Sequence, residues 1–172
     1  MLRKVSSMNS IEDEIRIWNT PLVSAYFLWR FVRGYVNEHA EHAAPSVVLC
    51  VIALTIMSDE NLYAPINPKK AKLSSYVYSF VKDKKSDALV TIHQLISESK
   101  FLCIDAIDMA TATGVVVWDA DHAALMPGDF EDAEPECVGK KHKANGDKAE
   151  LLGKWFAQLE VNQITTLLGV SL

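Results

Sequence analysis

"NTPLVSAYFLWRFVRGY" at residues 19–35 decides how this chain folds. Thr20 followed by Pro21 predicts a helix start, because a hydroxyl can cap the free backbone N–H groups and a proline at the first helical position loses no hydrogen bond. The residues behind this pair predict a helix of about five turns. The apolar side chains fall into two neighbouring rows at helical spacing, so two elements are expected to pack against this helix. One row holds Leu22, Ala25, Trp29, Val32 and Val36, and the other holds Leu28, Phe31 and Tyr35.

The length and composition predict a single domain over residues 1–172, with a sizeable apolar core. The formal charge of -5 at pH 7 argues against a protein that binds nucleic acid by bulk electrostatics. The longest apolar run, residues 47–57, is much shorter than the roughly 20 residues that cross a bilayer, and no signal peptide is recognisable. Cys50, Cys103 and Cys137 show no paired spacing. A protein of the reducing cytoplasm, without a membrane partner, is therefore expected.

The rest of the chain predicts a mainly α fold with one small β-hairpin, which is also the outline of a winged helix. Helices are expected over about 11–18, in the apolar run after Pro45, over 73–82, from Ser86 to about 112, and near the C-terminus, where Asn162 is the expected cap of the last helix. "TGVVVWDADHAALM" predicts two strands joined by a turn at Asp119 to Asp121. Residues 127–147 lack periodicity and collect Pro, Gly and charge, so a flexible loop is expected there.

Few residues suggest chemistry. His39 and His42 in "EHAEH" have a spacing that can bind a metal on a helix, but a third ligand is missing, and a solvated helix end explains them better. Glu98, Asp105 and Asp108 could hold a divalent ion, yet solvent-facing charge on a packed helix is the simpler interpretation. Cys50, Cys103 and His93 are expected in the core, and no phosphate-binding glycine loop is present. We therefore expect a protein that is not an enzyme and holds no cofactor or metal.

Three basic runs raise the alternative of a winged-helix-like module that binds DNA through its hairpin and lysines. Charge runs of this kind are usually only solvated, so the alternative depends on where the structure places them. The candidate DNA contacts are Lys69, Lys70, Lys84, Lys85, Lys140 and Lys141.

Two stretches, one near each end of the chain, resemble the paired signatures of the middle component of three-component ABC systems, the family that includes the small subunit of Lamassu-type anti-phage and anti-plasmid defence. The first signature has the form Asn-x-Pro followed by a helix that ends in Trp-x-Phe-x-x-Gly-Tyr. It is met by Asn19, Pro21, Trp29, Phe31, Gly34 and Tyr35. The second signature is met by Leu152, Gly153, Lys154, Trp155, Phe156, Leu167, Leu168, Gly169 and Val170.

The resemblance implies an adaptor that links an SMC-like ABC ATPase subunit to an effector nuclease subunit, so that DNA is contacted through the assembled complex. The residue types that dominate such interfaces are aromatic residues and arginine. The interface residues predicted on this basis are Trp29, Arg30, Arg33, Trp155 and Phe156. In the alternative, the tryptophan and phenylalanine side chains simply pack the two ends of this chain together.

Overall fold

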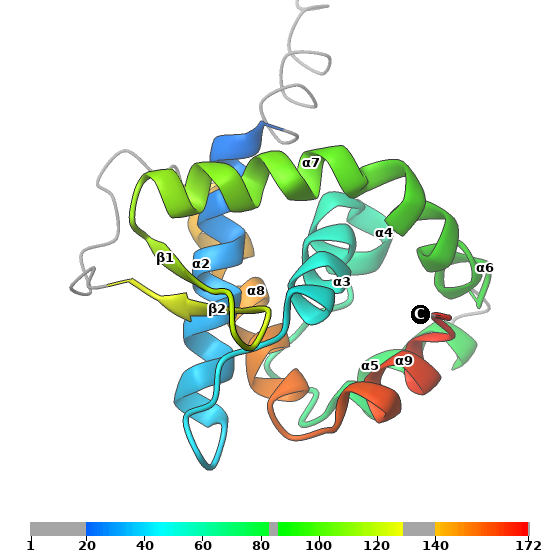
Figure 1. Ribbon diagram of the computed structural model, residues 1–172. Coiled ribbons are helices and arrows are strands. Elements are labelled where there is room, and N and C mark those ends of the chain that lie inside the picture. The colour runs from blue at the N-terminus through cyan, green and yellow to red at the C-terminus, as the bar shows by residue number, and fades with distance from the viewer. Residues whose placement is uncertain (1–19, 83–85, 129–139, 172) are drawn as a thin grey trace, which may run out of the picture.

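The computed structural model describes residues 20–82, 86–128 and 140–171. This part of the chain is mainly helical and contains a single two-stranded antiparallel hairpin, which confirms the predicted fold class (Figure 1). The expected helix over 11–18 lies outside the described residues. The helices are α2 (Pro21–Glu38), α3 (Val47–Ser58), α4 (Glu60–Tyr63), α5 (Leu73–Lys82), α6 (Ser86–Val90), α7 (Ile92–Ala112), α8 (Lys140–Phe156) and α9 (Val161–Leu168). The strands are β1 (Val116–Asp119) and β2 (Ala124–Pro127).

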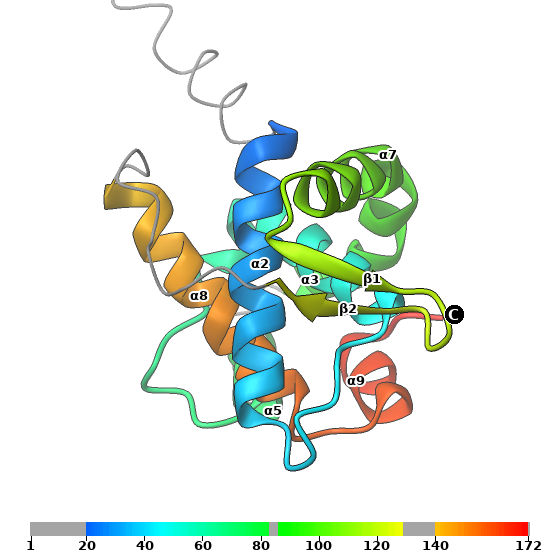
Figure 2. The same cartoon turned by 60° about the vertical axis from the view of Figure 1, so that its left-hand side comes forward.

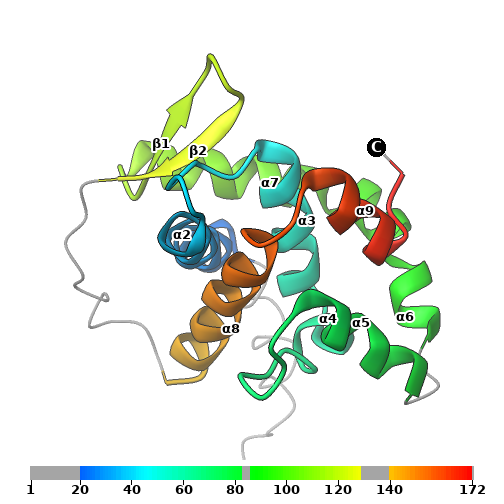
Figure 3. The same ribbon diagram turned by 90° about the horizontal axis from the view of Figure 1, so that it is seen from below.

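Helix α2 begins where the sequence predicts and has 18 residues. The Thr20 hydroxyl accepts a hydrogen bond of 3.4 Å from the backbone N–H of Val23, which caps the helix. α2 packs most extensively against α8, and then against α7 and α3 (Figures 1 and 3). These neighbours account for the two apolar rows, apart from Leu22 in the first turn, which is exposed.

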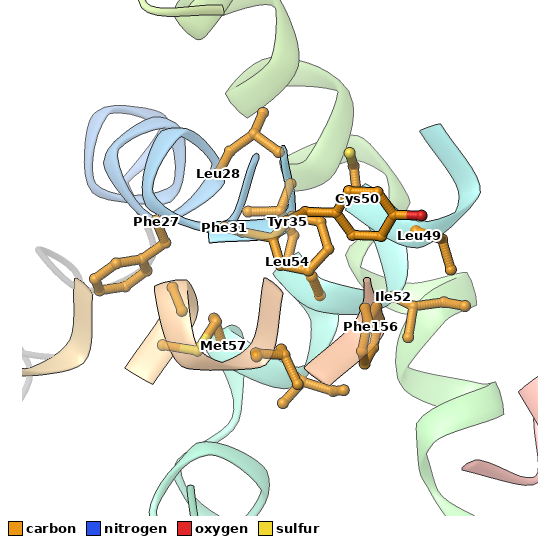
Figure 4. Close-up of a cluster of buried hydrophobic side chains, with 14 of the residues drawn as sticks. Phe27, Leu28, Phe31, Tyr35, Leu49, Cys50, Ile52, Leu54, Met57 and Phe156 are labelled. Carbon is orange, nitrogen blue, oxygen red and sulfur yellow. The ribbon is translucent and has the colours of Figure 1, made fainter. Parts of the chain in front are cut away.

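Helix α3 forms the centre of the core, and eight of its 12 residues are buried. Its side chains meet those of α2 in the apolar cluster that Figure 4 shows. The buried polar side chain in α3 is Thr55, and a buried hydroxyl is costly unless it is hydrogen-bonded. Its Oγ1 donates to the carbonyl of Val51 at 2.9 Å and lies 3.0 Å from the hydroxyl of Ser99 in α7. α3 is therefore held by both packing and a satisfied polar contact.

The hairpin is the one that the sequence predicts, and it is tied to the core at both ends. The backbone N–H of Val47 donates to the carbonyl of Ala123 at 2.9 Å, and that of Leu125 donates to the carbonyl of Pro45 at 3.1 Å. At the other end, Gly114 adopts a left-handed conformation with φ 74°, which lets the chain turn from α7 into β1. Hydrogen bonds and this turn thus fix the hairpin relative to α3 and α7 (Figure 2).

Helix α8 begins at Lys140, so the predicted loop over 127–147 is wrong for residues 140–147. Glycine and charge suggested a loop, but packing against α2 overrides the low helix propensity of this stretch. A side chain at Gly146 would collide with the ring of Tyr26 in α2. The glycine that suggested a loop is therefore a contact point between two helices.

Two further glycines allow α2 and α8 to approach closely. A Cβ atom at Gly34 would overlap the backbone carbonyl of Glu150, and one at Gly153 would overlap the backbone carbonyl of Phe31. Both glycines belong to the two sequence signatures. The paired signatures therefore meet in space, in the contact between α2 and α8.

Helix α9 begins two residues earlier than predicted, because Glu160 and not Asn162 is the N-cap. Glu160 and Gln163 form a capping box, in which the backbone N–H of Glu160 donates to Oε1 of Gln163 at 3.0 Å. Gly169, with φ 69°, ends the helix in the left-handed conformation that glycine favours. α9 packs on α5 at the end of the molecule opposite α7 (Figure 1).

Candidate interaction surface

Four of the five residues predicted to meet a partner are buried within this chain: Trp29, Arg30, Trp155 and Phe156. The ring of Phe156 meets that of Phe31 edge to face, with centroids 5.6 Å apart. Trp155 is 2% exposed and lies beside Tyr76, with ring centroids 5.9 Å apart. Side chains placed in this way offer no surface to a partner. Their burial argues for the alternative, in which they pack the two ends of the chain together.

Arg30 is the centre of a polar network between α2 and α8, although it is only 5% exposed. Its Nη2 lies 2.6 Å from Oδ1 of Asp147 and 2.8 Å from Oε2 of Glu150. Its Nη1 also donates to the hydroxyl of Tyr26 at 3.2 Å. Arg33, the fifth predicted residue, is half-buried and pairs with the same Glu150 oxygen at 3.1 Å. A buried arginine needs such partners, so the network locks α2 to α8.

The network shifts the pKa values of its members toward their charged forms. Burial alone would lower the pKa of Arg30, but Tyr26, Glu150 and Asp147 outweigh it and raise that pKa above its usual range. Burial alone would raise the pKa of Glu150, but Arg33, Lys154 and Arg30 together lower it. Each of these two charges is therefore stabilised by side chains of its own helix and of the opposite helix.

A cleft of about 670 Å³ lies beside this network, between α8 and residues 64–68. Charged side chains line it, but they pair with one another or with the backbone. Lys154 contacts Glu150 at 3.2 Å, and the ammonium group of Lys148 donates to the carbonyl of Ala64 at 3.4 Å. The polar walls of this cleft thus hold the fold together.

The candidate DNA-contacting lysines differ in their surroundings. Lys70 donates to the carbonyl of Pro65 at 2.7 Å and to the hydroxyl of Ser79 at 2.8 Å, so it closes a loop of its own chain. Lys69 is exposed, and Lys140 and Lys141 are exposed in the first turn of α8. The remaining two candidates, Lys84 and Lys85, lie outside the described residues.

The hairpin has the wrong charge for a wing that touches phosphates. Residues 115–128 contain no lysine or arginine and carry Asp119 and Asp121. Asp119 accepts hydrogen bonds from the backbone N–H groups of Asp121 and His122, at 3.1 and 3.3 Å, and therefore shapes the turn. Acidic side chains at the tip repel a nucleic-acid backbone, so nothing in the described hairpin favours the DNA-binding alternative.

The histidines of "EHAEH" shape the end of α2. Nδ1 of His39 accepts from the backbone N–H groups of Glu41 and Ala43, at 3.3 and 3.4 Å. His42 lies 2.9 Å from the carbonyl of Val36 through its own Nδ1. Both side chains thus satisfy backbone groups where the helix stops.

The remaining candidates for chemistry are also placed by the structure. Among residues 20–82, 86–128 and 140–171, no three His, Cys, Asp or Glu side chains gather in a way that could hold a metal ion. Cys50 and Cys103 are buried as predicted, and burial raises the pKa of both thiols. The prediction for His93 is wrong, because this side chain is exposed on α7.

An apolar groove between α7, β1 and the start of α3 is the feature that the sequence did not reveal. It has a volume of about 350 Å³. Trp118 is 46% exposed and Ile104 is 51% exposed, so two large apolar side chains of the groove face the solvent. Four of the six lining residues come from α7, and the other two come from α3 and β1, so only the spacing of the α7 residues could have indicated the groove. Its lining residues are Val47, Ile104, Ile107, Asp108, Thr111 and Trp118.

Residues 8–172 match the model of the ABC-three component (ABC-3C) system Middle Component 3. The chain belongs to this family. No curated protein and no solved structure matches the chain significantly.

In this ABC-3C middle component, the matched residues include both α2 and α8 as well as every wall of the groove. Membership of a multi-component system implies protein partners, and the groove is an exposed apolar surface that such a partner can cover.

None of the helices in the described part of the chain is both long enough and apolar enough to span a membrane.

Proposed function

We propose that this middle component is a non-enzymatic bridging subunit of a bacterial anti-phage and anti-plasmid defence complex of the Lamassu type. In this proposal it works in the cytoplasm and holds an SMC-like ABC ATPase to a nuclease effector. The observation that carries the proposal is the exposed apolar groove on a member of a middle-component family. Exposed apolar surface that is rimmed by polar residues is typical of protein interfaces.

The polar network between α2 and α8 supports the non-enzymatic part of the proposal. Arg30, Arg33 and Lys154 all pair with Glu150, so this group of charges stabilises the fold. An active site usually leaves a base or nucleophile poised toward a substrate. Here the charges are directed at each other across two helices.

The proposal is tested by co-expression of the chain with the ATPase and the effector encoded by the adjacent genes. A tag on the ATPase should recover the effector only when the middle component is present. Size-exclusion chromatography should then show all three proteins in one peak. Recovery of the effector in the absence of the middle component would contradict a bridging role.

DNA contact is proposed to occur through the assembled complex. The isolated chain should bind duplex DNA weakly at physiological ionic strength, since its net charge is negative. Fluorescence anisotropy with a labelled duplex, repeated over a series of salt concentrations, measures this directly. Tight binding by the chain alone, with a steep dependence on salt, would favour the winged-helix alternative.

A further inference from the structure

The groove between α7, β1 and α3 is a preformed surface. Its α3 wall is formed by Val47, whose backbone N–H donates a hydrogen bond to the carbonyl of Ala123 in the hairpin. Its β1 wall is carried by the same hairpin, which hydrogen bonds and the turn at Gly114 hold in place. A partner therefore meets walls that are already ordered, and binding costs less conformational entropy than it would on a mobile loop.

The apolar surface continues from the groove along one face of α7. Ile104, Ile107 and Thr111 follow the three- and four-residue spacing of a helix face, and Phe101 extends this row by one turn. Phe101 is 69% exposed. From Phe101 to Thr111 the row is about 15 Å long, which equals about three turns of a helix laid alongside it.

The charged side chains closest to the groove are acidic. Residues 92–128 form α7 and the hairpin and contain five acidic residues, two histidines and one lysine. The lysine is Lys100, and its ammonium group lies 5.2 Å from the centroid of the Phe101 ring, at the end of the row away from Thr111. Asp108 lies in the groove itself, and Asp105 is exposed beside it on α7. The surface is therefore apolar along its centre and acidic at its margins, and its complement is apolar with basic margins.

We propose that this groove binds an amphipathic helix of a protein partner, with an apolar stripe that covers Ile104, Ile107 and Trp118 and with lysine or arginine residues that face Asp105 and Asp108. The inference rests on the proposed function for the existence of a partner. A helix suits the groove because apolar anchors at successive turns match the spacing of the α7 row. Nucleic acid is excluded from this face by the acidic margins.

The position of the partner is tested by photocrosslinking in the complex of the three co-expressed proteins. A benzoylphenylalanine at position 104 should crosslink to a helical segment of the ATPase or effector that carries basic residues. The same group at position 81 is the matched control, because Val81 is 58% exposed on α5, away from the groove. Mass spectrometry identifies the crosslinked peptide. A crosslink from position 104 to a second copy of the chain, or to a segment without lysine or arginine, would overturn the proposal.

The chemistry of the groove is tested by paired variants in the same complex. Ile104→Asp should weaken assembly by about tenfold or more, as removal of a central apolar anchor does, whereas Val81→Asp should leave it unchanged. The double variant D105K/D108K should weaken assembly most at low salt, and Asp87→Lys on α6 is its control. Circular dichroism and thermal melting confirm that each variant is folded.

The two proposals fail in different ways. If the unmodified chain forms no complex with the ATPase and effector, the proposed function is wrong. If the unmodified chain assembles and Ile104→Asp and D105K/D108K assemble equally well, the function stands and the groove proposal is wrong. Loss of assembly in the α5 and α6 controls to the same extent would also overturn it, because the effect would not depend on the groove.

Discussion

Arg30 of α2 and Glu150 of α8 stand 120 residues apart in the sequence, and Nη2 of one lies 2.8 Å from Oε2 of the other. This ion pair lies beside the crossing point where Gly34 and Gly153 let the two helices touch. The polar network and the glycine contacts therefore act on the same pair of helices. Together they make the contact between α2 and α8 the main structural joint of the molecule.

Replacement of Arg30 by methionine should destabilise the protein by about 1–3 kcal/mol, because Glu150 loses its most buried partner but keeps Arg33 and Lys154. The free energy of unfolding is measured by urea denaturation at neutral pH. Arg33→Met is the control, since this side chain is more exposed and should cost about 1 kcal/mol or less. Equal effects of the two changes would contradict the central role given to Arg30.

Low pH should weaken the contact between α2 and α8, because Glu150 becomes protonated. Its pKa is held below the ordinary value of 4.5 in the folded protein, so folding is favoured by the charged form. The contribution of Glu150 to the free energy of unfolding is fully present above its ordinary pKa in the unfolded chain. It is lost as the pH falls through the lowered pKa of the folded protein. Urea midpoints from about pH 6 to about pH 3 should therefore fall less steeply for Glu150→Gln than for the unmodified chain. Parallel curves would show that Glu150 does not contribute.

Gly153→Ala should destabilise the fold although alanine favours helices. The added Cβ meets the backbone carbonyl of Phe31, so α2 and α8 must separate, at a cost of about 1–3 kcal/mol. Gly169→Ala is a useful contrast, because nothing lies within 4 Å of its Cβ position and only the positive φ opposes the change. Thermal melting should show the larger loss for Gly153→Ala.

Substitutions of two tryptophans should distinguish an effect on folding from an effect on assembly. Trp155→Ala empties a buried site and should cost about 3–5 kcal/mol, measured by urea denaturation. Trp118→Ala removes a half-exposed side chain and should change stability by about 1 kcal/mol or less, while it reduces co-purification with the partner subunits. A Trp118 variant that keeps full assembly would count against the groove.

Local signals in the sequence predicted much of the fold. The Thr20–Pro21 pair set the start of α2, and the turn residues around Asp119 and Asp121 set the hairpin, because these signals act through neighbouring backbone groups. The start of α8 and the cap of α9 were missed. In α8 the decisive contact is between Gly146 and Tyr26, which no local pattern reveals.

The interface was harder to predict, for a physical reason. An apolar helix face shows that a neighbour exists, but not whether that neighbour belongs to the same chain. Trp155 and Phe156 turned out to be covered by α2 and α5 of their own chain. Conversely, Val47, Ile104 and Trp118 lie in separate elements, and only the hydrogen bonds that anchor the hairpin bring them together.

The packing of α2 on α8 also sets an order of events at the ribosome. About a hundred residues separate the end of α2 from the start of α8, so on the order of 5–20 s of translation pass between them. During that interval the face of α2 that α8 covers in the folded protein can be shielded only by the earlier elements α3 and α7. Subunit assembly that begins only after α8 emerges avoids misdirected contacts with this side of α2.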